Sequence, residues 1–201
     1  MNRQQRAARV ITNVVVRFPF LWPVLRRPLT RIFDDVAPHW DARTSAERLV
    51  AFEAALEQVP GEPRTILDLG TGTGDGAIAL AQRWPKAEVM GVDVSRAMVE
   101  EARRKAPELR FEVGDGSALT VPNACYDLVA MNNVIPFANE LARVVRPGGH
   151  VLLAFSRGDE TPIYVPPERL RRGLARAGFE VTADLSAEPG TAMVARCAET
   201  H

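Results

Sequence analysis

The strongest constraint on the fold is an alternation of two patterns along residues 64–197. Short apolar runs of strand-forming residues alternate there with segments whose apolar residues recur at helical spacing. The runs lie at 65–69, 89–92, 110–113, 127–131 and 150–155, and the helical segments lie at 75–83, 96–105, 137–145 and 167–177. Strands that alternate with helices form a parallel sheet covered on both faces. We therefore predict an α/β domain built on a doubly wound sheet.

The end of the chain breaks this alternation. Residues 179–185 and 191–197 are two strand-like runs joined through Glu188-Pro189-Gly190, with no helical segment between them. Two strands connected by a short turn pair in the antiparallel sense. The sequence therefore predicts a hairpin at one edge of the sheet.

The junction at residues 60–63, which contains two prolines and a glycine, separates two predicted regions. Residues 1–60 form an N-terminal helical extension, and residues 61–201 form the α/β domain. We predict two amphipathic helices in the extension. The first is basic and stops at Pro19, because proline cannot continue a helix, and the second spans about 46–59.

Charge is distributed unevenly along the chain. The 25 basic and 25 acidic side chains cancel, so no chain-wide field attracts nucleic acid and we expect no nucleic-acid partner. Residues 1–33 nevertheless contain seven arginines and no acidic residue. A basic amphipathic helix either packs on the domain or lies on anionic lipid, so peripheral contact with an anionic membrane is one expectation. No apolar run approaches the roughly 20 residues of a membrane span.

Cysteine usage bears on metal binding and on the cellular compartment. Cys125 and Cys197 form neither a CxxC motif nor a cluster with histidine. This spacing is unlike that of a disulfide scaffold or a structural zinc site. We therefore expect no metal and a reducing compartment, which means a cytoplasmic protein that can also lie at a membrane surface.

Three motifs of glycine and aspartate follow three of the predicted strands. The first strand runs into residues 67–76, where four glycines alternate with other residues before a helix begins. Glycine lets the backbone approach a ligand closely, and a helix start directs amides at it. Asp93 ends the second strand, where a carboxylate can accept both hydroxyls of a ribose. Asp115, between Gly114 and Gly116, follows the third strand. The motifs predict a nucleotide-type ligand, with a tight turn and a helix cap as the structural alternatives.

These motifs resemble those of class I S-adenosylmethionine-dependent methyltransferases. The matching segments are Asp68-Leu-Gly-Thr-Gly-Thr-Gly, Gly91-Val-Asp93-Val-Ser, Gly114-Asp115-Gly, Tyr126-Asp127-Leu-Val and Arg146-Pro-Gly-Gly. The resemblance covers about residues 64–197 and includes the closing hairpin. It implies a Rossmann-like sheet of order 3-2-1-4-5-7-6 with strand 7 antiparallel, and S-adenosyl-L-methionine as the cofactor.

The resemblance also implies which residues contact the cofactor, all of them near the ends of the first four strands. They are Asp68, Gly70, Thr71, Gly72, Gly74, Asp93, Val94, Met98, Asp115, Gly116, Asn132 and Asn133. Asp68 would lie beneath the methionine amino group, and Asp93 would hold the ribose. Either Val94 or Met98 would pack on adenine, and Asp115 with Gly116 would contact its exocyclic nitrogen. Asn132 or Asn133 would face the sulfonium and the substrate.

The region before the domain bears on the substrate and on the reaction. The segment 31–41 is similar to a stretch of methyltransferases that act on quinones and related small hydrophobic molecules, with Trp40 where tyrosine is usual. Short loops after the fourth and fifth strands leave the N-terminal 60 residues to cover the site. In-line methyl transfer needs alignment and a dry site more than proton transfer. If a base is used, His39 is the only histidine placed to act.

Two other functions fit part of the pattern. A nicotinamide-dependent oxidoreductase could use the glycine-rich loop and Asp93, but Asp68, Asp115 and the hairpin argue against it. A non-catalytic adenosylmethionine-binding protein at the membrane is consistent with the short loop after the fourth strand. Methylation of nucleic acid is disfavoured because residues 132–137 lack the Asn-Pro-Pro-Tyr/Phe order.

Overall fold

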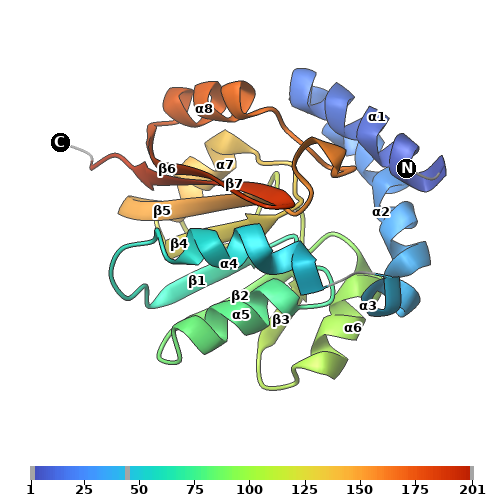
Figure 1. Cartoon of the computed structure of the whole chain (residues 1–201), viewed down its shortest axis with the longest axis horizontal. Helices are drawn as coiled ribbons and strands as arrows, with labels where there is room; N and C mark the ends of the chain where they lie inside the picture. Colours follow the sequence, from blue (N-terminus) through green and yellow to red (C-terminus); the bar gives the residue numbers. More distant parts are fainter. Residues whose placement is uncertain (1–2, 44–45, 200–201) are drawn as a thin grey trace.

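A seven-stranded sheet lies at the centre of the protein (Figure 1). The computed structural model describes residues 3–43 and 46–199. The sheet has the order β3-β2-β1-β4-β5-β7-β6. Its strands are β1 (Thr65–Leu69), β2 (Glu88–Asp93), β3 (Arg110–Val113), β4 (Tyr126–Asn132), β5 (Val145–Phe155), β6 (Phe179–Ala187) and β7 (Gly190–Cys197). Neighbouring strands from β3 to β5 are parallel, and β7 is antiparallel to β5 and β6. The predicted strand order and hairpin are confirmed.

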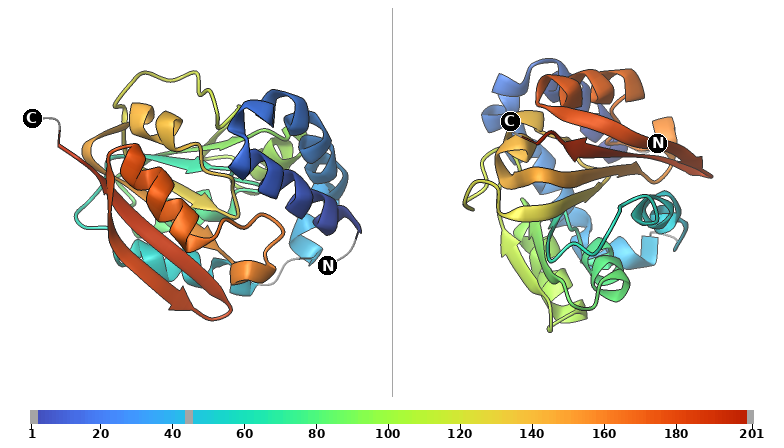
Figure 2. Two further views of the ribbon diagram at one scale, coloured as in Figure 1. Left: turned by 90° about the horizontal axis from the view of Figure 1, so that it is seen from above. Right: turned by 90° about the vertical axis from the view of Figure 1, so that its left-hand side faces the viewer.

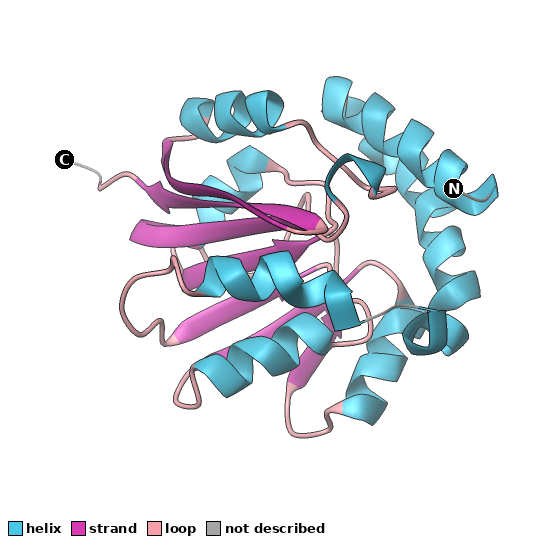
Figure 3. Cartoon of the chain, viewed as in Figure 1, coloured by secondary structure: helices cyan, strands magenta, loops and turns pink. Residues whose placement is uncertain are grey.

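Helices cover both faces of this sheet, as Figures 2 and 3 show. They are α4 (Val50–Leu56), α5 (Asp75–Arg83), α6 (Arg96–Lys105), α7 (Ala138–Val144) and α8 (Pro167–Arg176). Successive strand residues point to opposite faces, so Ile66 packs in the core under α4, α5 and α6, whereas Leu67 packs in the core under α7 and α8. The two apolar faces explain why the strands consist of nearly unbroken apolar runs.

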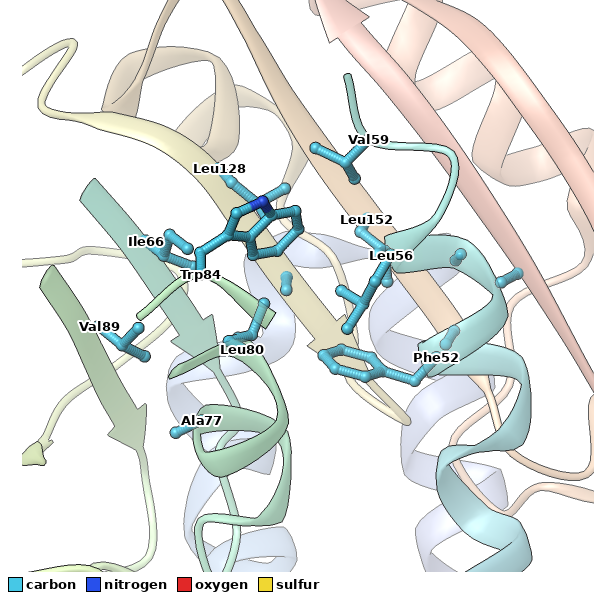
Figure 4. Close-up of a cluster of buried hydrophobic side chains, with 14 of the residues drawn as sticks. Phe52, Leu56, Val59, Ile66, Ala77, Leu80, Trp84, Val89, Leu128 and Leu152 are labelled. Atoms are coloured by element: carbon cyan, nitrogen blue, oxygen red, sulfur yellow. The ribbon is translucent and has the colours of Figure 1, made fainter. Parts of the chain in front are cut away.

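Helix α4 is part of the domain core, although it lies within the predicted extension 1–60. Phe52 is fully buried in the core that includes β1, β4 and β5. Figure 4 shows Phe52 and Leu56 pointing from α4 toward the side of the cluster where Leu80 of α5 lies. The part of the extension that lies outside this core is residues 3–43.

The predicted helix at 46–59 is shorter in the structure. A 3-10 turn, η3 (Ala46–Leu49), precedes α4. After Leu56 the chain turns, and the amides of Gln58 and Val59 donate to carbonyls three residues earlier. Pro60, next along the chain, has no amide to donate. The helix therefore ends before the junction that the sequence indicates.

Residues 3–43, which we call the N-terminal cap, lie over the carboxyl ends of the parallel strands. The cap consists of α1 (Arg3–Arg17), η1 (Pro19–Leu21), α2 (Trp22–Val36), η2 (Ala37–His39) and α3 (Trp40–Arg43). Val15, Trp22 and Leu29 are buried against Ile135, which follows β4, and Ile163, which follows β5. The first helix ends before Pro19 as predicted, and the cap occupies the edge where the glycine and aspartate motifs lie.

Candidate functional site

The glycine-rich loop after β1 has the backbone that its sequence indicates. Gly70, Gly72 and Gly74 have φ values of 72°, 54° and 90°, a region that other residues rarely adopt. A Cβ on Gly70 would lie 2.2 Å from Val134 Cγ2, whereas a Cβ on Gly72 would have nothing within 4 Å. The backbone at Gly72 therefore faces open space, as a loop that approaches a ligand requires.

Asp93 lies beside this loop, although 21 residues separate it from Gly72. Its carboxylate oxygens accept hydrogen bonds from the Gly72 amide at 2.9 Å and from the Ser95 amide at 2.8 Å. Burial raises the pKa of Asp93, and these backbone hydrogen bonds oppose that rise. The structure thus brings the first and second motifs together, with a buried carboxylate at their junction.

Asp68 lies beneath the loop and is 2% exposed. It accepts a hydrogen bond from the Thr71 hydroxyl at 2.5 Å and another from the amide of Ala77. Burial raises the pKa of Asp68 to about 7, even though these hydrogen bonds favour its charged form. A cationic group placed above this carboxyl would lower its pKa again. Thr71 therefore supports Asp68 from within the loop.

Asp115 is bound by the N-terminal cap. Its Oδ1 accepts hydrogen bonds from Trp22 Nε1 at 2.8 Å and from the amide and hydroxyl of Ser117 at 2.9 Å and 2.8 Å. Its Oδ2 pairs with the Arg26 guanidinium. Partial burial opposes the shift, but the hydrogen bonds from Ser117, Trp22 and Arg26 together lower the pKa of Asp115. The third motif is therefore a contact point for α2.

The two asparagines at the end of β4 have different partners. Asn133, with a φ of 60°, donates to Ser156 Oγ at 3.0 Å and accepts from the Ser156 amide at 2.8 Å, which ties the end of β4 to the end of β5. Asn132 donates to the carbonyl of Arg48 at 3.1 Å. Its Oδ1 is buried and has no hydrogen-bond partner among the described residues. The Oδ1 of Asn132 can therefore accept a hydrogen bond from a ligand, whereas the Oδ1 of Asn133 already accepts one from Ser156.

A cavity of about 460 Å³ lies between α2 and the carboxyl ends of β2 and β3. Its lining residues are Val94, Val113, Gly114, Asp115, Arg26, Arg27, Thr30 and Arg31. Of the two residues that could pack on adenine, Val94 borders this cavity, whereas Met98 is 1% exposed inside the core. Gly116 lies against Leu69, because a Cβ on it would be 3.2 Å from that side chain. His39 is exposed on η2.

An ion-pair network fastens the end of the cap to the glycine-rich loop. Lys105 of α6 lies 2.5 Å from Asp41 and 3.0 Å from Asp75. The Thr73 hydroxyl donates to Asp41 at 2.8 Å, and Arg48 pairs with Asp75. Sequence patterns do not reveal this network, because its members come from α3, η3, the glycine-rich loop, α5 and α6. It closes the cap over the loop.

Two further observations concern metal binding and membrane-spanning helices. Among the described residues, no three His, Cys, Asp or Glu side chains are grouped so that they could hold a metal ion. None of the described helices is long and apolar enough to span a membrane. The available groups are backbone amides, three aspartates and one asparagine, which can form hydrogen bonds with a polar organic ligand.

Comparisons with known proteins agree with this geometry. Residues 66–149 match a family described as a methyltransferase domain. Malonyl-[acyl-carrier protein] O-methyltransferase of Halorhodospira halophila is 38% identical in an alignment of length 148 that covers 68% of this chain and 50% of that protein. Demethylmenaquinone methyltransferase of Deinococcus radiodurans is 36% identical in an alignment of length 138 that covers 61% of this chain and 57% of that protein.

A solved structure shows the same fold. A SAM-dependent methyltransferase from Aquifex aeolicus aligns with a TM-score of 0.63 and 22% identity, and the alignment covers 81% of this chain and 97% of that one. The chain spans about half the length of the curated relatives it matches.

Proposed function

We propose that this chain transfers a methyl group from S-adenosyl-L-methionine to a small hydrophobic molecule. The basis is the class I S-adenosylmethionine-dependent methyltransferase domain that the chain carries. The hydrogen bond from Gly72 to Asp93, together with Val94 and Asp115 in the lining of one cavity, supports the proposal most strongly. The similarity of residues 31–41 to quinone methyltransferases, and the quinone in the name of one relative, favour a hydrophobic substrate.

The residues present fit this cofactor. Open space beside Gly72 admits a ligand next to the backbone. In our proposal Asp93 accepts the ribose hydroxyls, Val94 and Asp115 flank the adenine, and Asp68 lies beneath the methionine amino group. When bound, the cofactor supplies a methyl group on a positively charged sulfur that is a good leaving group.

The protein's own part is to orient the reactants and to exclude water. The buried Oδ1 of Asn132 offers an acceptor to a polar hydrogen of the cofactor or substrate. The N-terminal cap closes the site on the side of the loop through Asp41, which accepts a hydrogen bond from Thr73 and pairs with Lys105. Orientation and dehydration supply most of the acceleration in such a displacement. His39 is the proposed base for an acceptor that must lose a proton.

The direct test is ligand binding followed by turnover. Calorimetry on the full chain should show binding of S-adenosyl-L-methionine and S-adenosyl-L-homocysteine but not of a nicotinamide dinucleotide. A labelled methyl group should then pass to members of a panel of hydrophobic phenols and quinols over many turnovers. Binding of the dinucleotide alone, or cofactor binding without turnover on any acceptor, would contradict the proposal.

We infer in addition that the N-terminal cap contacts an anionic membrane. On α1, Arg3, Arg6, Val10 and Arg17 are exposed on the side opposite the buried residues Ala8 and Val15. Phe20 is 74% exposed in the turn that follows. Arginines beside exposed apolar side chains favour an anionic bilayer surface. A hydrophobic substrate dissolved in that bilayer would then lie near the site.

Sedimentation with lipid vesicles tests this contact. The full chain should sediment with anionic vesicles, sediment less with neutral ones, and be released as salt rises. Equal binding to both vesicle types, or binding to neither, would show that the cap serves only for packing.

A further inference from the structure

The cavity beside α2 has a rim that is richer in positive charge than a methyl-donor site requires. Arg26, Arg27 and Arg31 line it from α2, and Asp115 is the only carboxylate among its lining residues. Three guanidinium groups therefore face one carboxylate. S-adenosyl-L-methionine has a positively charged sulfur, so this excess charge is not explained by the proposed cofactor.

Two of these arginines form no ion pair with any of the described residues. Arg26 is paired with Asp115. Arg27 and Arg31 are exposed and make no ion pair or hydrogen bond with any described residue, and Asp35, four residues after Arg31, is not paired with it. Like charges four residues apart on a helix repel each other and destabilise it. An anion between the two guanidinium groups would offset this repulsion.

We propose that Arg27 and Arg31 bind a phosphate group at the rim of this cavity. A planar guanidinium donates two parallel hydrogen bonds to phosphate oxygens, and two guanidinium groups on adjacent turns can hold one phosphate from both sides. The contacts proposed for adenine, Val94 and Asp115, come from the sheet side of the cavity. The phosphate site is thus a second site beside the cofactor.

The surroundings of the rim suggest what bears the phosphate. Val24 is 72% exposed and lies three residues before Arg27, on the same side of α2. The phosphate site is therefore continuous with the exposed apolar surface of the cap. Two sources have this chemistry: the headgroup of a lipid in the bilayer on which the cap would rest, or a free phosphate ester.

The test compares two double variants of the full chain. Arg27→Gln/Arg31→Gln removes the rim charges. Arg172→Gln/Arg176→Gln removes the same charge at the same spacing from exposed positions of α8. Inorganic phosphate is titrated into each protein by calorimetry, at an ionic strength held constant with chloride. In a second arm, each protein is sedimented with vesicles that contain phosphatidic acid or phosphatidylserine. Cofactor binding is measured on the same preparations, so failure of the proposed methyltransferase function is seen separately.

We expect the wild type and the α8 variant to behave alike and the α2 variant to bind at least about tenfold more weakly, which corresponds to about 1.4 kcal/mol. A selective loss with inorganic phosphate identifies a site for free phosphate. A selective loss confined to vesicles identifies a lipid headgroup. If the two double variants lose the same affinity, the loss follows net charge alone and the proposal is overturned. The proposal is also overturned if neither phosphate nor vesicle binding is weakened in the α2 variant.

Discussion

Replacement of Asp93 by alanine should weaken cofactor binding by a predictable amount. Its carboxylate is buried and already accepts hydrogen bonds from the amides of Gly72 and Ser95. A hydrogen bond to a charged group contributes about 1.5 to 3 kcal/mol. If the two ribose hydroxyls donate to the same carboxylate, their combined loss should be of that size, because one carboxylate serves all these donors. Binding of S-adenosyl-L-methionine and S-adenosyl-L-homocysteine should then weaken about 10- to 100-fold alike.

The same substitution should also lower stability, since it leaves two amides without their acceptor. Asp127 is a matched control near the start of β4, at the end of the parallel strands opposite to Asp93. Its Oδ2 accepts the amides of Arg64 at 2.8 Å and of Thr65 at 3.0 Å. Asp127→Ala should therefore reduce the free energy of unfolding while cofactor affinity stays at the wild-type value.

Calorimetry on protein shown to be folded by circular dichroism separates the two effects. Asp93→Asn should bind with intermediate affinity, because the amide keeps one acceptor but no charge. The ribose contact of Asp93 is refuted if Asp93→Ala binds like the wild type, or if Asp127→Ala weakens binding to the same extent. The first result would reduce Asp93 to a residue that organises the loop and the start of α6.

Three other regions give specific expectations. Burial raises the pKa of Asp68 from 3.8 to about 7, so between about pH 4 and pH 7 the folded protein retains a proton that the unfolded chain loses, and stability falls as pH rises. Asp68→Asn should flatten this fall in urea titrations at a series of pH values. Phe52→Ala should cost about 3 to 5 kcal/mol in urea unfolding, against about 0.5 kcal/mol or less for the more exposed Val50→Ala; equal costs would contradict the place of α4 in the core. A chain that begins at Ala46 should keep a cooperative unfolding transition in urea but lose turnover, and unchanged turnover would show that the cap is not a cover.

Local sequence patterns predicted the sheet because its strands are apolar and regularly separated by helices. The strand order came from a resemblance in the motifs, and the structure bears it out. The glycines and Asp93 were predicted together for a physical reason: the carboxyl ends of parallel strands meet at one edge. The length of the helix at 46–59 was wrong because its end depends on a turn at Gln58 and Val59, which apolar spacing does not reveal.

Contacts between distant segments could not be predicted in this way. The bonds from Trp22 and Arg26 to Asp115 join residues about ninety positions apart, and an amphipathic helix can place either residue against many surfaces. The choice between Asn132 and Asn133 depends on Ser156, at the end of another strand. Such pairings follow from tertiary packing rather than from spacing along the chain.

The contact of α2 with Asp115 has a thermodynamic consequence. One helix holds Asp115 on one side through Trp22 and Arg26, and presents Val24 to solvent on the other. If adenine draws Asp115 away from α2, cofactor occupancy changes the freedom of that helix, and binding at its outer side changes the cofactor affinity by the same factor. The partition of the protein between bilayer and water would then report the supply of methyl donor.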